Sequence, residues 1–168
     1  RFLAGGAQGE GDFSLVLLNG LPPNRAVWFA GWQNQDPALG SSLIGIHHPD
    51  GSYKRIAFGA RVTDRAASVG GQAAPAARFL QVQMTDGRIE GGSSGSPLYD
   101  AGGRIVGALS YGPVAPPGQS ECDIANFRAG YGRFTSAYET LRPLLEDGVS
   151  TPLSVTPQTL SFRGADGI

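Results

Sequence analysis

The hydrophobic pattern consists of short apolar runs separated by residues that favour turns. The runs are continuous in Phe13–Leu18 and alternate with polar residues in Phe79–Met84. Both patterns are typical of β-strands, and the Gly, Pro, Asn and Asp residues between the runs are typical of turns. The expected strands cover residues 13–18, 27–32, 43–47, 53–58, 79–84, 97–99, 104–111 and 131–134. A turn at residues 49–52 makes a hairpin of 43–47 and 53–58.

The pattern predicts one helix, near the C-terminal end. Ser136 and Glu139 form a capping box, and the leucines that follow give the segment an apolar face. Pro143 should shorten or kink this helix. Residues 64–77 and 113–126 are expected to be loops. Because strands and helices do not alternate, the sequence predicts an antiparallel all-β fold with a short C-terminal helix.

Composition and charge exclude several function classes. The chain has 168 residues, 40% of them hydrophobic, and a formal net charge of −1. Nucleic acids and anionic membranes need clustered basic residues, so we expect neither as a partner. No apolar run reaches the roughly 20 residues of a membrane-spanning helix. Adjacent His47 and His48 are a weak metal signal, and we expect neither a metal nor a cofactor.

A turn rich in glycine and serine carries the strongest chemical signal. It reads Gly92-Ser93-Ser94-Gly95-Ser96-Pro97. A serine nucleophile needs a base for its proton and hydrogen-bond donors for the oxyanion. A sharp bend would aim the N–H groups of Gly92 and Ser94 at one point, which makes Ser94 the candidate nucleophile and these two N–H groups the oxyanion hole. A structural hairpin loop is the alternative, because short motifs also occur by chance.

Further segments resemble those of trypsin-like serine proteases. In that family a strand after the nucleophile ends in a Ser-aromatic-Gly segment that pairs with the substrate, as Ser110-Tyr111-Gly112 does here. The catalytic aspartate of the family precedes a buried apolar strand, as Asp12 does. The resemblance implies that Asp12 orients the general base and that Ser110, Tyr111 and Gly112 hold the substrate strand.

Within that family, the motif order is similar to that of bacterial lysyl endopeptidases of the Achromobacter type. The shared motifs are Asp12-Phe-Ser-Leu15, Trp28-Phe-Ala-Gly-Trp32, Ile46-His-His-Pro49, Gly92–Pro97 and Tyr131-Gly132-Arg133. The similarity covers about residues 2–147 and implies a chymotrypsin-like double β-barrel. It also implies a secreted, monomeric serine endopeptidase that cleaves proteins or peptides without a cofactor.

This fold divides the chain into three expected parts. Residues 1–20 would end a first barrel that is incomplete here, and 21–147 would form the second barrel with the nucleophile and the helix. Residues 148–168 would be a linker and the start of a truncated β-sandwich-like domain. The opening residues also lack the ordered regions of a signal peptide, so we expect a fragment of a longer protein.

The general base is missing from its place in the family. It lies before the aspartate, and residues 1–11 hold no histidine. His47 and His48 would give the order of subtilisin, but that enzyme carries its serine at a helix start in an α/β fold, so we expect neither to be the base. The α/β-hydrolase elbow fails because Ser96 stands where glycine is needed. We expect the base upstream of residue 1, and this chain alone to be inactive.

The resemblance also bears on Cys122, the single cysteine. In lysyl endopeptidases a cysteine of this loop is joined to one near the N-terminus, which implies a disulfide from Cys122 to an upstream residue.

The preference for the substrate side chain before the scissile bond (P1) stays open. The lysine-selecting aspartate of the family stands where this chain has Ala129, and the trypsin pocket aspartate stands where it has Arg88. Glu90 matches an acidic residue of the lysyl group, and Asp123 is a second acidic candidate. Either could bind a basic P1 side chain or be a solvated loop residue. The family also has a histidine in place of Ser110.

The sequence therefore leaves two alternative functions open. The first is a serine endopeptidase, with cleavage after Lys or Arg as one option. The second is a non-catalytic, protease-like module that binds proteins and has lost its histidine.

Overall fold

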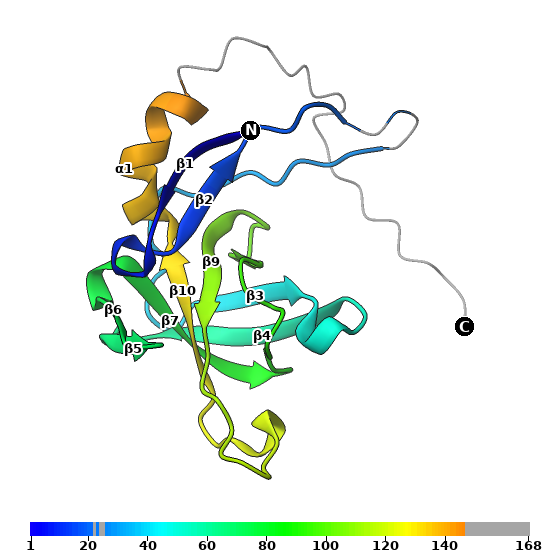
Figure 1. The fold of residues 1–168 in the computed structure, drawn as a ribbon, viewed down its shortest axis with the longest axis vertical. Helices are drawn as coiled ribbons and strands as arrows, with labels where there is room; N and C mark the ends of the chain where they lie inside the picture. The colour runs from blue at the N-terminus through cyan, green and yellow to red at the C-terminus, as the bar shows by residue number, and fades with distance from the viewer. Residues whose placement is uncertain (22, 24–25, 147–168) are drawn as a thin grey trace.

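Short strands are the main regular elements in the described part of the computed structural model (Figure 1). The structure describes residues 1–21, 23 and 26–146, so the segment expected to start a sandwich domain, 148–168, lies outside the described residues. In chain order the elements are β1 (Phe2–Gly6), η1 (Gln8–Glu10), β2 (Phe13–Val16), β3 (Ser42–His47), η2 (Pro49–Gly51), β4 (Arg55–Val62), β5 (Ala67–Val69), β6 (Gln72–Ala74), η3 (Ala76–Arg78), β7 (Phe79–Asp86), β8 (Pro97–Tyr99), β9 (Ile105–Tyr111), η4 (Glu121–Asp123), β10 (Arg128–Arg133) and α1 (Phe134–Leu145).

Six strands close into an antiparallel barrel in the order β10-β7-β4-β3-β8-β9. The β3–β4 ladder runs from Ser42 opposite Ala60 to His47 opposite Arg55, which confirms the expected hairpin. β9 closes the barrel by pairing with both β8 and β10. A closed barrel leaves no free strand edge, so its rim can hold loops in fixed positions.

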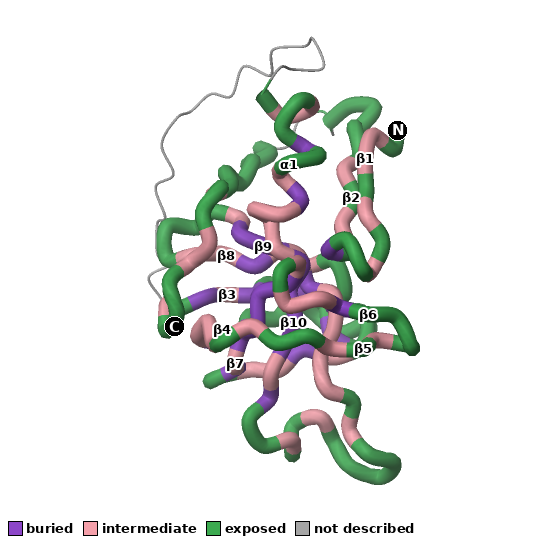
Figure 2. Tube along the Cα trace, turned by 90° about the vertical axis from the view of Figure 1, so that its left-hand side faces the viewer, coloured by how far each residue is buried: buried purple, intermediate pink, exposed green. Residues whose placement is uncertain are grey.

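Inward-facing side chains fill the barrel, where the buried residues of Figure 2 gather. Along β3 burial alternates: Leu43, Gly45 and His47 are buried, whereas Ile46 is exposed. This two-residue period places every second side chain in the interior. The core cluster comprises Leu43, Ala57, Leu80, Val82, Met84, Ile89, Leu98, Val106, Leu109, Phe127, Ala129 and Tyr131.

The β1–β2 hairpin lies outside the barrel, at the same end as α1 (Figure 1). Its turn rests on β10, and Gly132 makes this possible. A Cβ atom at Gly132 would lie 2.0 Å from the carbonyl oxygen of Gly11. Glycine in the Tyr-Gly-Arg segment therefore lets the turn that carries Asp12 approach the barrel backbone.

Residues 27–32, predicted as a strand, are not one. Only Trp32 pairs, in an isolated parallel bridge with Ile105 at the start of β9. Val27, Trp28 and Phe29 are partly exposed, and no strand of the described residues runs alongside them. An apolar run forms a strand only where a neighbour completes its ladder, so the prediction was wrong for this segment.

Three other expectations need correction. The loop expected at 64–77 contains the β5–β6 hairpin. β7 is buried on both faces at its start rather than half-buried, because Leu80 and Val82 enter the core and the Tyr111 side chain covers Phe79 and Gln81 on the other face. The capping box is absent: α1 begins at Phe134, and the Ser136 hydroxyl donates to the Arg133 carbonyl instead. Ser136 thus lies inside the first turn, where its hydroxyl bonds to a preceding carbonyl.

A largely buried network of two arginines and two aspartates ties the chain segments around the barrel together. Arg133 on β10 forms ion pairs with Asp36 and, at 2.6 Å, with Asp64. Arg61 on β4 reaches Asp64 at 2.8 Å. Burial alone would raise the pKa of Asp64, but hydrogen bonds from the Gln81 N–H and Arg61 and the charges of both arginines hold it below its usual value.

Removing Arg133 should therefore cost much more stability than removing an exposed arginine. Arg133→Ala leaves two partly buried carboxylates short of a partner and should lower the free energy of unfolding by about 3 kcal/mol. Arg104→Ala is the matched control, because the Arg104 side chain is 50% exposed in its pair with Asp100. It should cost about 1 kcal/mol or less. Urea unfolding of the protein measures both losses, and equal losses would contradict the assigned role of the network.

Candidate active site

The segment from Glu90 to Ser96, here termed the nucleophile loop, is held from two sides. On one side the Gly95 N–H donates to the Leu109 carbonyl at 2.7 Å, and the Leu109 N–H donates to the Ser96 carbonyl at 2.8 Å. On the other side the Asp50 N–H donates to the Gly91 carbonyl at 2.7 Å. The loop thus docks on β9 of the barrel and on the turn that follows β3.

Glycine is required at position 92 for two reasons. Its φ of +90° is unfavourable for other residues, and a Cβ atom there would lie 3.2 Å from the His48 carbonyl oxygen. Within the described residues the N–H groups of Gly92 and Ser94 donate no hydrogen bond. They are therefore free to bind a negatively charged oxygen, and Ser94 itself is exposed.

Asp12 is linked to the barrel through Ser110. The Ser110 hydroxyl donates to Asp12 Oδ2 at 2.7 Å, and the Gln8 side-chain amide donates to Ser110 Oγ at 2.9 Å. An amide nitrogen can only donate, so Ser110 must accept from Gln8 and direct its own proton to the carboxylate. Gln8 thereby fixes the orientation of the hydroxyl. No pattern in the sequence indicates this role, because a glutamine near a turn is common and carries no motif of its own.

These contacts bring Asp12 and Ser94 to the same end of β9. Ser94 precedes Gly95 and Ser110 follows Leu109, and Gly95 and Leu109 are hydrogen-bonded to each other. Asp12 in turn contacts Ser110. Among the described residues Asp12 and Ser94 form no direct hydrogen bond, and both are exposed. A group that bridges them could take the serine proton and be oriented by the carboxylate.

Neither histidine of the chain is that group. His47 Nδ1 lies 2.9 Å from Ser93 Oγ in a buried pair, and His48 Nδ1 lies 3.3 Å from the Ser52 carbonyl oxygen. Burial lowers the pKa of His47, and the nearby charge of His48 lowers it further. The structure therefore brings His47 to the serine next to the predicted nucleophile, and to neither Ser94 nor Asp12.

The segment expected to hold the substrate is tightly supported. The Gln81 side chain donates to the Tyr111 hydroxyl at 2.7 Å, and the Tyr111 ring packs on Phe79 with centroids 5.4 Å apart. Gly130 faces this ring so closely that a Cβ atom would lie 2.1 Å from it. A Cβ atom at Gly112 would lie 2.9 Å from Ile89 Cδ1. Tyr111 and Gly112 are thus fixed against the barrel.

The residues considered for substrate preference do not converge on one acidic pocket. Ala129 is fully buried, and the Arg88 guanidinium lies over the Phe127 ring at 5.5 Å. Asp123 accepts a hydrogen bond from the Ser120 N–H at the start of η4, a local capping contact. Glu90 lines a cavity of about 420 Å³ together with Pro49, Arg55, Ile56, Gly87, Arg88 and Cys122. The Cys122 thiol is free and exposed.

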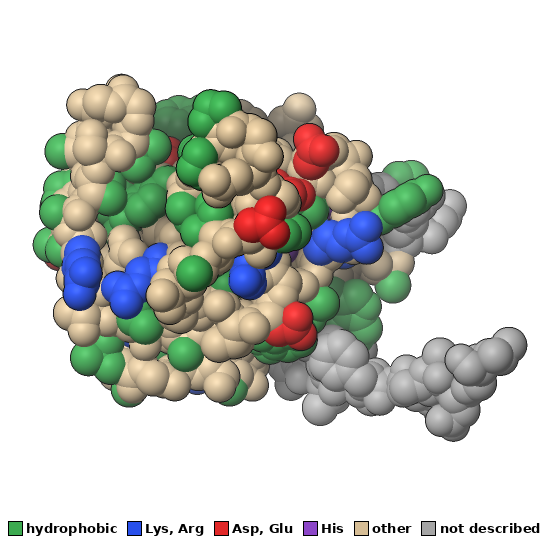
Figure 3. Space-filling view, turned by 90° about the horizontal axis from the view of Figure 1, so that it is seen from below, with side chains coloured by type: hydrophobic (Ala, Val, Ile, Leu, Met, Phe, Trp, Pro, Cys, Tyr) green, Lys and Arg blue, Asp and Glu red, His purple; other side chains and the backbone are tan. Residues whose placement is uncertain are grey.

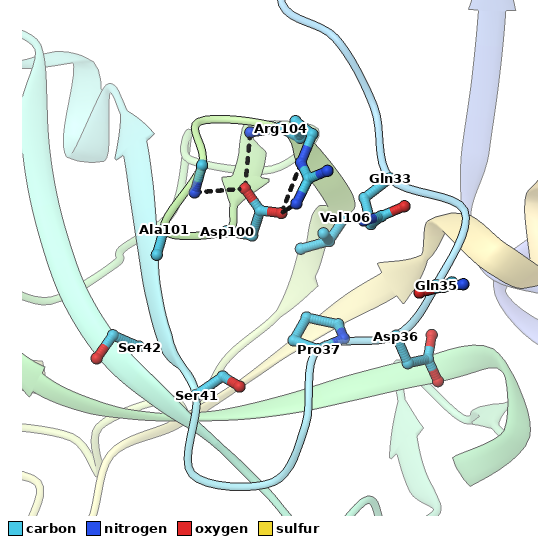
Figure 4. A pocket seen from close by; sticks show the side chains of 11 residues that line it. Gln33, Gln35, Asp36, Pro37, Ser41, Ser42, Asp100, Ala101, Arg104 and Val106 are labelled. Carbon is cyan, nitrogen blue, oxygen red and sulfur yellow. Dashed lines mark hydrogen bonds and ion pairs between the residues drawn. The ribbon is translucent and has the colours of Figure 1, made fainter.

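A second cavity of about 410 Å³ lies between residues 33–42 and the β8–β9 turn (Figure 4). Asp100 in that turn accepts hydrogen bonds from Arg104 and the Gly102 N–H. The turn lies at the opposite end of β8 from the nucleophile loop, so this cavity is separate from the candidate site.

The described residues show few other features that point to a ligand. They contain no group of three His, Cys, Asp or Glu side chains placed to hold a metal ion. No described helix is long and apolar enough to cross a bilayer. On the face seen in Figure 3, basic and acidic side chains lie scattered among apolar and polar ones, without a continuous basic surface.

Comparison with known proteins decides the family. The family model for the C-terminal domain of lysyl endopeptidase matches residues 3–127. The chain belongs to this family. It is also 30% identical over 131 residues to the lysyl endopeptidase of Pseudomonas aeruginosa. This alignment covers 74% of this chain and 27% of that protein. The chain thus spans about a quarter of the length of this curated relative.

Solved structures show the fold of this lysyl endopeptidase domain. The Rv3671c protease of M. tuberculosis in its active form matches with a TM-score of 0.56 at 15% identity, over 84% of this chain and 57% of that one. The HtrA-type protease AlgW with a decapeptide matches with a TM-score of 0.55 at 18% identity, over 84% of this chain and 39% of that one. The expected chymotrypsin-like fold is confirmed, and the family relationship links the chain to peptidases.

Proposed function

We propose that this domain carries the nucleophile and the orienting carboxylate of a secreted serine endopeptidase. One observation supports this most: Ser94 stands exposed on a docked loop with two free N–H groups, at the end of the strand whose Ser110 bonds to Asp12. Membership of the lysyl endopeptidase family agrees with it. Proteins or peptides are the expected substrates.

The proposed reaction is acyl transfer. Ser94 Oγ attacks the peptide carbonyl while a histidine takes its proton, and the Gly92 and Ser94 N–H groups bind the resulting oxyanion. The histidine then protonates the leaving amine, which leaves an ester of Ser94. Water hydrolyses this ester with the same histidine as base. Asp12 orients the imidazole and stabilises its cation.

The histidine is proposed to come from outside these 168 residues. His47 and His48 are engaged with Ser93 and Ser52, away from Asp12. Apolar side chains are also exposed on the β1–β2 hairpin and on 27–32, among them Phe2 at 65%, Val16 at 55% and Trp28 at 53%. Exposed apolar side chains are typical of an interface where they lie close together. We propose that the upstream part of a first barrel, with the base, covers it.

Labelling of the parent protein with a fluorophosphonate tests the proposed nucleophile. Ser94 Oγ should bond to phosphorus and expel fluoride. Ser94→Ala should abolish labelling, and Asp12→Asn should slow it by about 10⁴-fold because the base loses its orientation. Ser42→Ala, which changes an exposed serine on β3, should label like the wild type. Folded wild-type protein that does not label would favour the non-catalytic binding module.

Glu90 is the residue that we propose for a preference for Lys or Arg at P1. It is half-buried at the start of the nucleophile loop, and a charge-assisted bond to a basic side chain would be strong there. Pro49 and Ile56 make part of the cavity wall apolar, and Glu90 would supply the negative charge. Arg55 and Arg88 line the same cavity and would compete for it.

Peptide substrates that differ only at P1 test this preference. Glu90→Gln should lower kcat/KM for Lys and Arg substrates by about 10-fold and leave Gln and Ala substrates unchanged, because only the basic side chains lose a charged partner. Asp123→Asn, a change in an exposed loop carboxylate, should alter neither. A wild type that prefers uncharged P1 residues would rule out the basic preference and leave the assignment of Ser94 intact.

A further inference from the structure

A buried polar pair lies directly behind the candidate nucleophile. Ser93 is 1% exposed and His47 is 2% exposed, and Ser93 Oγ lies 2.9 Å from His47 Nδ1. Apart from the long contact with the Glu90 N–H, at 3.5 Å, this ring nitrogen is the only described partner of the Ser93 hydroxyl. A buried hydroxyl without a partner is costly, so the pair holds Ser93 in place.

Because of the position of Ser93, its contact with His47 affects both N–H groups of the candidate oxyanion hole. Ser93 lies between Gly92 and Ser94, the two residues whose N–H groups are free to bind an oxyanion. Gly91, Gly92 and Gly95 surround it, and glycines allow peptide groups to rotate at little cost. The Asp50 contact fixes the Gly91 carbonyl and the Leu109 contacts fix Gly95 and Ser96. Between them, the Ser93 side chain is the anchor that reaches the barrel interior.

His47 is itself held rigidly. It faces the barrel interior from β3, on the same side as Leu43 and Gly45. A Cβ atom at Gly45 would lie 3.1 Å from the Tyr131 hydroxyl and 4.0 Å from His47 Cδ2, so the imidazole and the tyrosine share the space beside this glycine. A ring packed in this way has little freedom, and its Nδ1 is a fixed point for the loop.

We propose that His47 is a positioning residue, which through Ser93 holds the nucleophile loop so that the N–H groups of Gly92 and Ser94 converge on the oxyanion. The catalytic part of this inference rests on the proposed function, whereas the mechanical part concerns the loop alone. Nothing in the reaction requires His47 to exchange a proton with the substrate. Among the described residues the His48 side chain forms no hydrogen bond with the nucleophile loop, so His48 serves as a control.

Acid should weaken this anchor. Burial, with a smaller effect of the His48 charge, lowers the pKa of His47 below its usual 6.5. The unfolded chain therefore binds the proton more readily, so the stabilisation is complete above about pH 6.5 and declines as the pH falls below it. Besides His48, the titratable residues around His47 are Arg55 opposite it on β4, Tyr131 on β10 and Glu90 in the loop.

Hydrogen exchange of the parent protein tests the mechanical part. Ser93→Ala and His47→Phe should each speed exchange of the amides in 90–96 by about 10-fold, the effect of losing one such bond. The double variant should exchange no faster than the faster single one, because both remove the same contact. His47→Asn places an amide oxygen near the position of Nδ1 and should restore protection. His48→Phe should exchange like the wild type.

The pH dependence of hydrogen exchange in the loop distinguishes a hydrogen bond to His47 from a general packing effect of its side chain. At pH 5.5 the wild-type loop should exchange faster, relative to the intrinsic rate, than at pH 8, and His47→Asn should show no such change. If His47→Phe fails to unfold cooperatively, Ser93→Ala, which removes one hydroxyl, decides the question. Equal protection of the loop in the wild type and Ser93→Ala would overturn the proposal.

Kinetics test the catalytic part. Ser93→Ala should lower the rate constant of fluorophosphonate labelling by about 10- to 100-fold and leave KM for a peptide substrate unchanged, because oxyanion donors act in the transition state. A rate constant of labelling that is the same in Ser93→Ala as in the wild type would overturn this part. A wild type that does not react with the fluorophosphonate would contradict the proposed function. If Ser93→Ala nevertheless speeds hydrogen exchange in 90–96, the role of the Ser93–His47 pair in holding the loop would be supported.

Discussion

The hydrogen bond from Ser110 to Asp12 is the contact on which the candidate site depends. It joins the β1–β2 hairpin, which lies outside the barrel, to the end of β9. The same strand end fixes the nucleophile loop through Leu109. One strand therefore sets the position of a carboxylate on one side and of a serine on the other. The rigidity of the closed barrel is transmitted to both groups through hydrogen bonds of 2.7–2.8 Å.

Glycines and buried polar pairs shape the site in complementary ways. Gly132 lets the turn before Asp12 approach β10, and Gly92 allows the bend that frees two N–H groups. Freedom of this kind must be restrained if the loop is to keep one conformation. The Ser93–His47 pair supplies the restraint from the barrel interior, and Gln8 supplies a similar one for the Ser110 hydroxyl. The acyl-transfer proposal thus depends on residues that never contact substrate.

The spacing of apolar runs and turn residues predicted an antiparallel all-β fold, and the resemblance to trypsin-like proteases predicted the barrel, which the closed six-strand sheet confirms. The spacing failed at 27–32, where an apolar run predicts a strand but pairing needs a neighbour that lies elsewhere in space. The predicted capping box at Ser136 was wrong because the same Ser-x-x-Glu sequence can occur inside the first turn of a helix as well as at its start. Motif order placed Ser94, Asp12 and Ser110 in one family, and the structure brings them to one strand end. Gln8 and the pairing of His47 with Ser93 were beyond reach, since both depend on contacts between distant segments.

The most direct test is a crystal structure of the parent protein with a peptide aldehyde. The account predicts a hemiacetal on Ser94 Oγ, with its oxygen within hydrogen-bond distance of the Gly92 and Ser94 N–H groups. It also predicts a histidine from outside these 168 residues between Ser94 and Asp12. An adduct on another residue, or an Asp12 carboxylate that contacts no histidine, would contradict it.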